Sequence, residues 1–185
     1  MSDSIRTFVA VKFPAPSALR PVLRSLAAMN WPVAAVSPDN LHVTLKFLGS
    51  TPIESRVAIQ NQIAESVIGQ PPFVLRVVGL GAFPRAERPS VLWAGLIDAE
   101  PLVSFAQQLE GALEPLGFAR ESRAFHPHLT LARVKGLPPR KFFELLHMYA
   151  NTDFGTVEIP SVKFIRSDLE RNGAHYSTLA ECRLR

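Results

Sequence analysis

Apolar residues in the first half of the chain switch between strand spacing and helix spacing. Strand-like runs fall at 7–13, 41–48 and 73–78. Between the first two runs, a helix is indicated by Leu19, Val22, Leu23 and Leu26, and a second helix is expected over 54–68. Residues 31–40 are rich in Pro, Ser and Asp and predict a loop. The first half therefore predicts the order β-α-β-α-β.

The same order restarts after a loop expected at 79–89. Strands are expected at 91–96, around His128 and at 157–165. Two helices between them have apolar stripes, formed by Leu102, Phe105, Ala106, Leu109 and Leu113 in one and by Phe142, Leu145, Leu146 and Tyr149 in the other. A final alternating strand near the C-terminus is expected to pair with the strand that precedes Arg166.

The spacing of the two halves indicates an internal duplication. His42 follows Phe8 by 34 residues, and His128 follows Leu92 by 36. Two similar lobes related by a pseudo-twofold axis place equivalent strands side by side, with a cleft between the lobes. We therefore expect one α+β domain over 1–185, with lobes at about 1–80 and 90–170 and with strand 174–184 completing a sheet.

Each half carries a His-x-Thr-x tetrad on an expected strand. The tetrads are His42-Val43-Thr44-Leu45 and His128-Leu129-Thr130-Leu131. Because strand side chains alternate, each tetrad presents an imidazole and a hydroxyl on one face. With an ordinary pKa near 6.5, one imidazole can be protonated and the other neutral, which supplies a general acid and a general base. Either tetrad alone fits a strand whose His and Thr face solvent; two copies on matching strands favour one active site.

Composition limits the class of protein. A hydrophobic content of 47% supports a sizeable core, and a formal charge of +4 mildly favours an anionic partner such as RNA. The single cysteine, Cys182, fits a reducing cytoplasm and is expected to pack. The chain has neither the pattern of a signal peptide nor an apolar run long enough to span a bilayer, so we expect a soluble, cytoplasmic protein with no membrane partner.

Two imidazoles and two hydroxyls suit phosphodiester chemistry. A 2′,3′-cyclic phosphate needs a base to activate water on one side, an acid to protonate the leaving sugar oxygen on the other, and hydroxyls to hold the non-bridging oxygens. No metal or cofactor is required. A metal site is the weaker alternative, since each tetrad supplies one ligand and no acidic ligand sits at a matching place.

Beyond the tetrads, several segments carry a family resemblance: the opening Arg6-Thr7-Phe8-Val9-Ala10-Val11, the extensions of both motifs to Gly49 and Arg133, Ser167-Asp168-Leu169, and Gly173-Ala174-His175-Tyr176. With them the chain resembles the RNA 2′,3′-cyclic phosphodiesterases, also named 2′-5′ RNA ligases, of the two-histidine phosphoesterase superfamily. The resemblance implies a two-lobed α+β fold with antiparallel sheets facing a cleft. It also implies metal-independent hydrolysis of cyclic-phosphate RNA ends to 2′-phosphates, and reversible 2′-5′ joining of tRNA halves.

The resemblance assigns roles to individual residues. His42 becomes the proton donor to the leaving O3′ and His128 the proton acceptor from water, although the residues themselves do not distinguish these roles. Thr44 and Thr130 are expected to bind phosphate oxygens, or alternatively to support their histidines.

Four further residues are candidates of other kinds. Arg133 is a candidate phosphate ligand, but strict alternation places it on the back face unless the strand bulges. Lys46 has the parity of His42 and is a possible substrate contact, with a solvated lysine as the alternative. Phe13 is a candidate for stacking on a base, with core packing as the alternative. His126 is expected at the rim.

Other functions remain open at this point. One is a non-catalytic RNA-binding module that retains the fold. Another is a related phosphodiesterase for a small substrate, such as ADP-ribose 1″,2″-cyclic phosphate or a 2′-5′ oligonucleotide. RNA with cyclic-phosphate ends, including tRNA fragments, is the expected partner, and no obligate protein partner is indicated.

Overall fold

The computed structural model describes residues 3–30, 32–170 and 173–185. It contains four α-helices and nine β-strands in these residues. They are β1 (Ser4–Lys12), α1 (Arg20–Ala27), β2 (Val33–Ala35), β3 (His42–Pro52), α2 (Arg56–Ser66), β4 (Phe73–Phe83), β5 (Val91–Ile97), α3 (Glu100–Leu113), β6 (His128–Val134), α4 (Arg140–Met148), β7 (Asp153–Ile159), β8 (Ser161–Glu170) and β9 (Gly173–Arg183).

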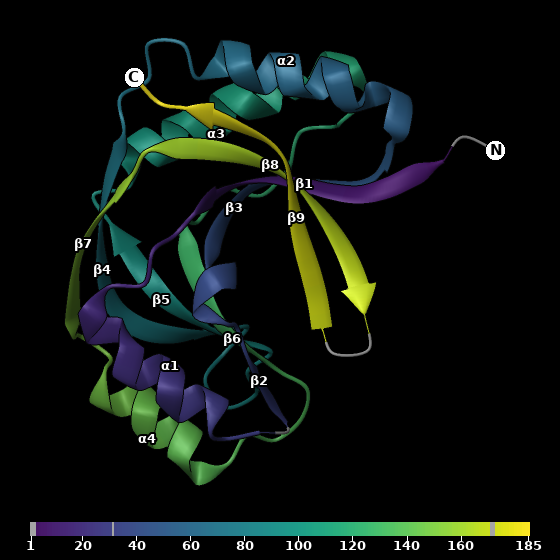
Figure 1. The fold of residues 1–185 in the computed structure, drawn as a ribbon. Coiled ribbons are helices and arrows are strands. Elements are labelled where there is room, and N and C mark those ends of the chain that lie inside the picture. The colour runs from purple at the N-terminus through teal and green to yellow at the C-terminus, as the bar shows by residue number, and fades with distance from the viewer. Residues whose placement is uncertain (1–2, 31, 171–172) are drawn as a thin grey trace.

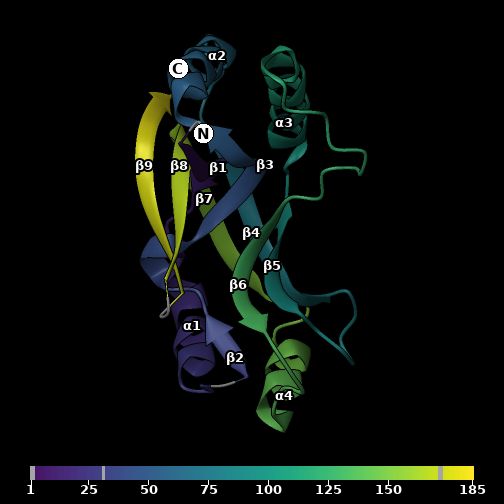
Figure 2. The same ribbon diagram turned by 90° about the vertical axis from the view of Figure 1, so that its right-hand side faces the viewer.

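The strands form two antiparallel sheets (Figures 1 and 2). Sheet A has the order β3-β1-β8-β9, and sheet B has the order β2-β6-β5-β4-β7. Every strand pairing within the two sheets is antiparallel. Helices α2 and α3 lie together at one end of the molecule, and α1 and α4 lie at the other. The expected α+β class with antiparallel sheets is confirmed.

The two sheets exchange strands between the sequence halves. β4 belongs to the first half but lies between β5 and β7 in sheet B, while β8 belongs to the second half but lies between β1 and β9 in sheet A. β4 and β5 pair as a hairpin because a short connection joins them, and consecutive antiparallel strands tend to be neighbours. The sheets therefore do not coincide with lobes drawn at 1–80 and 90–170.

Pro160 divides what the sequence predicts as one strand at 157–165. β7 ends at Ile159 in sheet B, and β8 begins at Ser161 in sheet A. Proline has no N–H to donate to a ladder, so it marks the point where the chain leaves one sheet for the other. The prediction of a single strand here was wrong. The expected pairing of the C-terminal strand with this region is confirmed, since β9 pairs with β8 throughout.

Other boundaries also differ from the sequence prediction: β1 begins at Ser4, β3 continues to Pro52 and β7 begins at Asp153. The strand expected at 73–78 continues to Phe83 through an irregularity in its pairing with β5. Gly79 permits this because it has φ of 71°, and an added Cβ would collide with the carbonyl oxygen of Ala150. The loop expected at 31–40 contains the short β2, which pairs with β6; Trp31 itself lies outside the described residues.

One apolar cluster joins the back faces of both sheets. It includes Val11 and Leu45 from sheet A, Leu92 and Leu131 from sheet B, and Phe105 from α3. The opposite face of sheet A carries a smaller cluster of Phe8, Ala10 and Ile165, with Tyr176 packed against it. The tetrads thus project from sheets whose other faces are fixed in a shared core. In the part of the chain that the structure describes, no helix is long and apolar enough to cross a membrane.

Candidate active site

The two tetrads begin strands with the same burial pattern. In β3 and in β6, a half-buried His, a buried apolar residue and a half-buried Thr are followed by two consecutive buried residues and then an exposed one. The consecutive pairs are Leu45-Lys46 and Leu131-Ala132. Each coincides with a register shift against the neighbouring strand, as a β-bulge produces. The duplication therefore extends to an irregularity that strict alternation does not predict.

We call the sheet face that carries the His and Thr of a tetrad the motif face. On sheet A, His42 lies opposite Lys12, and Thr44 lies opposite Ala10. On sheet B, His128 lies opposite Gly95, and Thr130 lies opposite Trp93. β3 and β6, the strands that carry the two tetrads, contact each other.

Both imidazoles are held by the same hydrogen bond. Nδ1 of His42 is 2.7 Å from the carbonyl oxygen of Asn40, and Nδ1 of His128 is 2.8 Å from that of His126. A carbonyl only accepts, so Nδ1 carries a proton in each ring and Nε2 is left to exchange a proton with a ligand. His126 itself is exposed, and its backbone rather than its side chain supports the site.

Aromatic rings flank both histidines. The ring of His42 lies 5.1 Å from Phe8 and 5.2 Å, edge to face, from Tyr176. The ring of His128 lies 5.2 Å, edge to face, from Phe83. These contacts restrict the orientation of each imidazole, so its Nε2 points in a fixed direction.

The pKa of His42 lies below its ordinary value. Burial is the main cause, because it disfavours the charged ring, and the positive charge of Arg133 lowers the pKa further. The hydrogen bond to the Asn40 carbonyl opposes both effects. In the unliganded protein, His42 is therefore biased towards its neutral form.

Arg133 reaches the motif face of sheet B. The bulge at Leu131-Ala132 shifts the alternation by one residue, so Arg133 lies opposite Val91 and is exposed. The charge of Arg133 also lowers the pKa of His42, so its guanidinium lies near the first tetrad as well. Strict alternation would put Arg133 on the back face, but the bulge meets the condition under which this residue reaches the motif face, so a phosphate-binding role is geometrically open to it.

Lys46 is turned away from the motif face by the equivalent bulge in β3. It lies opposite Val9, a core residue, and its side chain is only 3% exposed. Its amine makes a salt bridge with Glu110 of α3 and donates a hydrogen bond of 2.8 Å to the carbonyl of Ala119. The structure therefore does not place Lys46 as a substrate contact. Phe47 takes the exposed position on the motif face, 6.1 Å from the Phe8 ring.

Phe13 belongs to the main core. Its side chain is fully buried, with 0% exposure, and it is part of the cluster behind the sheets. A ring in that position has no free face for a nucleobase, so the stacking role that the sequence suggested is not supported. The alternative of core packing describes it.

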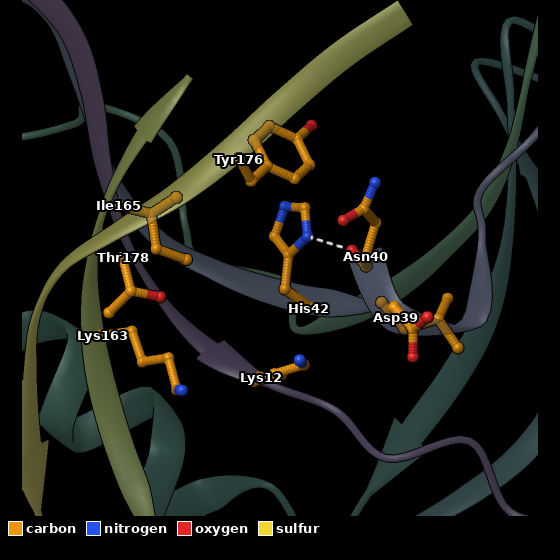
Figure 3. Close-up of a pocket in the computed structure, with 9 residues that line it drawn as sticks. Lys12, Asp39, Asn40, His42, Lys163, Ile165, Tyr176 and Thr178 are labelled. Atoms are coloured by element: carbon orange, nitrogen blue, oxygen red, sulfur yellow. Dashed lines mark hydrogen bonds between the residues drawn. The ribbon is translucent and has the colours of Figure 1, made fainter. Parts of the chain in front are cut away.

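A cavity of about 70 Å³ lies beside His42 (Figure 3). Its lining includes Lys12, Asn40, Lys163, Tyr176 and Thr178. Sequence reasoning missed these residues, because Lys12 becomes a neighbour of His42 only through the β1–β3 register, and Tyr176 only through the pairing of β9 with β8. The one sequence signal for Tyr176 is that its segment, Gly173-Ala174-His175-Tyr176, belongs to the family resemblance. No group of three or more metal-ligating side chains occurs among the described residues.

Comparison with known proteins identifies the family. Residues 15–170 match the model of the 2′-5′ RNA ligase superfamily. The chain belongs to this superfamily. A relative named RNA 2′,3′-cyclic phosphodiesterase, from Aeropyrum pernix, is 36% identical over 161 residues, which cover 85% of this chain and 89% of the relative.

Solved structures share the fold over nearly the whole chain. The crystal structure of TT0787 of Thermus thermophilus is similar with a TM-score of 0.83 and 28% identity, over 98% of each chain. The crystal structure of Escherichia coli LigT complexed with 3′-AMP is similar with a TM-score of 0.73 and 26% identity, over 98% of this chain and 99% of LigT.

Proposed function

We propose that this superfamily member is a cyclic phosphodiesterase that hydrolyses RNA 2′,3′-cyclic phosphate ends to 2′-phosphates. The observation that carries the proposal is the matched pair of histidines, each with Nδ1 bound to the carbonyl two residues earlier and Nε2 left to exchange a proton. Relatives such as the Aeropyrum pernix protein bear the name of this activity. Mere binding of RNA would not need two imidazoles held in this way.

In the proposed reaction, water attacks phosphorus in line with the bond to O3′. Nε2 of His128 accepts a proton from the water, the P–O3′ bond breaks, and Nε2 of His42 gives its proton to O3′. Thr44, Thr130 and Arg133 bind the non-bridging oxygens as negative charge builds up on them. The net result is the addition of one water, with the phosphate left on O2′.

The lowered pKa of His42 sets a condition on its role as the acid. The free protein favours the neutral ring, whereas the donor must be protonated. An anionic phosphodiester next to the ring favours the charged form and raises its pKa. Substrate binding therefore recruits the proton that His42 later donates.

The same site is proposed to join RNA ends through 2′-5′ linkages, including those of tRNA fragments, when a 5′-hydroxyl group replaces water as the nucleophile. Nε2 of His128 then accepts the proton of that hydroxyl, the P–O3′ bond breaks and Nε2 of His42 gives its proton to O3′; cleavage of the linkage exchanges the two roles. Cytoplasmic action is proposed from the cysteine usage, since Cys182 is free.

The decisive experiment is phosphorus NMR of the product formed from a short RNA with a 2′,3′-cyclic phosphate end. In-line attack with His42 beside O3′ leaves a 2′-phosphate; a 3′-phosphate would refute the assignment of acid and base. Turnover should also continue after dialysis against a chelator, because the histidines and hydroxyls supply the phosphate chemistry. Loss of activity that a divalent ion restores would refute the metal-independent mechanism. Binding without any turnover would instead identify an RNA-binding module.

A further inference from the structure

A groove of about 800 Å³ lies over helix α1, next to the cavity beside His42. Its lining includes Lys12, Arg20, Leu23, Arg24, Val36 and Asp39. The groove is therefore walled by one face of α1 and by the segment that leads into the His42 strand. This is a much larger space than the cavity at His42 itself.

The groove carries excess positive charge. Arg20 and Arg24 lie one turn apart on α1, and both are exposed. Neither arginine, nor Lys12, takes part in the salt bridges formed among residues 3–30, 32–170 and 173–185. Asp39 is the acidic residue in the lining. Three cations against one carboxylate favour an anionic occupant.

The groove is continuous with the candidate active site. Lys12 and Asp39 line both the groove and the cavity beside His42. Lys12 also lies directly opposite His42 in the β1–β3 pairing. An extended ligand with one end at His42 can therefore pass Lys12 and reach the arginines without leaving the surface.

We propose that this groove binds the RNA strand on the 5′ side of the cyclic phosphate. The inference rests on the proposed function and adds the path of the substrate. A 2′,3′-cyclic phosphate is at the 3′ end of its strand, so the remaining nucleotides leave the site in one direction. Arg20 and Arg24 bind successive phosphates, and the half-buried side chain of Val36 contacts a sugar or base.

The test compares two substrates: cytidine 2′,3′-cyclic monophosphate, which ends at the cyclic phosphate, and a cyclic-phosphate RNA of roughly eight nucleotides. The variant combines Arg20→Gln with Arg24→Gln, because glutamine preserves helix propensity. The matched control combines Arg140→Gln with Lys141→Gln, which removes the same charge from the exposed face of α4. Circular dichroism and the melting temperature establish that both variants fold.

For the octamer, the groove variant should lower kcat/KM roughly three- to tenfold at low salt, as expected for two exposed charge contacts. In a plot of log kcat/KM against log salt concentration, the slope for the groove variant should be shallower by about 1.4. Each phosphate contact on a single strand contributes about 0.7 to that slope, and the variant lacks two. The cyclic mononucleotide and the α4 control should change little.

The outcomes separate the two proposals. If wild-type protein turns over neither substrate, the proposed function fails. The RNA path is wrong if the wild-type protein turns over both substrates but the groove variant changes kcat/KM equally for both. It is also wrong if the groove variant behaves like the α4 control, or if it changes neither kcat/KM nor its salt dependence.

Discussion

At the scale of single residues, His42 and His128 share a motif and a supporting hydrogen bond but differ in their surroundings. His42 is packed against both Phe8 and Tyr176, and burial together with the positive charge of Arg133 lowers its pKa. His128 contacts Phe83. The surroundings, rather than the shared His-x-Thr-Leu pattern, therefore lower the pKa of His42.

Replacing either histidine should remove most of the activity. We expect His42→Ala and His128→Ala each to lower kcat for cyclic-phosphate RNA by about 10²–10⁴-fold with little change in the fold, because each loses one proton transfer. The double variant should lose far less than the product of the two effects, since the pair acts as a unit. Steady-state kinetics measure this, with His147→Ala on the surface of α4 as a control. Near-full activity in both single variants would contradict the mechanism.

The pKa of His42 should respond to its charged neighbours. NMR titration of the imidazole should give a pKa below about 6.5 in the free protein, because the folded state disfavours the charged ring. Arg133→Gln should raise the pKa part of the way, since burial remains, and added inorganic phosphate should raise it in the wild-type protein. A pKa that neither change moves would show that Arg133 and the phosphate lie away from His42.

At the scale of elements, a single bulge gives the first motif strand, β3, two functions. Up to the bulge, β3 presents His42 and Thr44 on the motif face; after it, Lys46 enters the interior and binds Glu110 and the Ala119 carbonyl. Glu110 also accepts a hydrogen bond of 3.1 Å from the backbone N–H of Glu121. The first motif strand thereby anchors α3 and the segment that leads to the second tetrad.

Breaking this anchor should cost both stability and activity. Lys46→Met leaves Glu110 without its cation and should lower the free energy of unfolding by about 3 kcal/mol, which urea titration measures. Adding Glu110→Leu should recover part of that loss, because no unpaired charge then remains. The control is Arg76→Met, which breaks an exposed salt bridge with Asp153 and should change stability little.

Lys46→Met should also lower kcat of the folded protein, since the segment before His128 loses its anchor. If Lys46→Met were as stable and as active as the Arg76→Met control, the salt bridge would be a passive feature of the interior.

At the scale of the whole molecule, the exchange of β4 and β8 makes each sheet depend on both halves of the chain. Sheet A without β8 loses the strand that joins β1 to β9, and sheet B without β4 loses the strand that joins β5 to β7. The shared apolar cluster behind the sheets has the same dependence. The chain passes between the sheets four times, from β1 to β2, β2 to β3, β3 to β4 and β7 to β8, and these crossings tie the two motif strands together.

Separate halves should therefore not fold. Cutting the chain in the 84–90 connection gives two fragments, each with one tetrad. The first fragment lacks β8, a central strand of sheet A, and the second lacks β4, a central strand of sheet B. We expect both fragments alone to give poorly dispersed proton–nitrogen NMR spectra, and a mixture to recover dispersion and some activity. Two independently folded fragments would show that the lobes are autonomous, as the halves at 1–80 and 90–170 would suggest.

The sequence by itself determined the duplication, the strand positions of His42 and His128, the α+β class and the family resemblance, because these depend on local periodicity and motif spacing. Only the tertiary structure decided which side chains reach the motif face. A bulge exists only between paired strands, so the positions of Lys46 and Arg133 require the register with β1 and β5. The exchange of β4 and β8 and the approach of Lys12 and Tyr176 to His42 likewise depend on contacts between distant segments, which alternation along one strand does not encode.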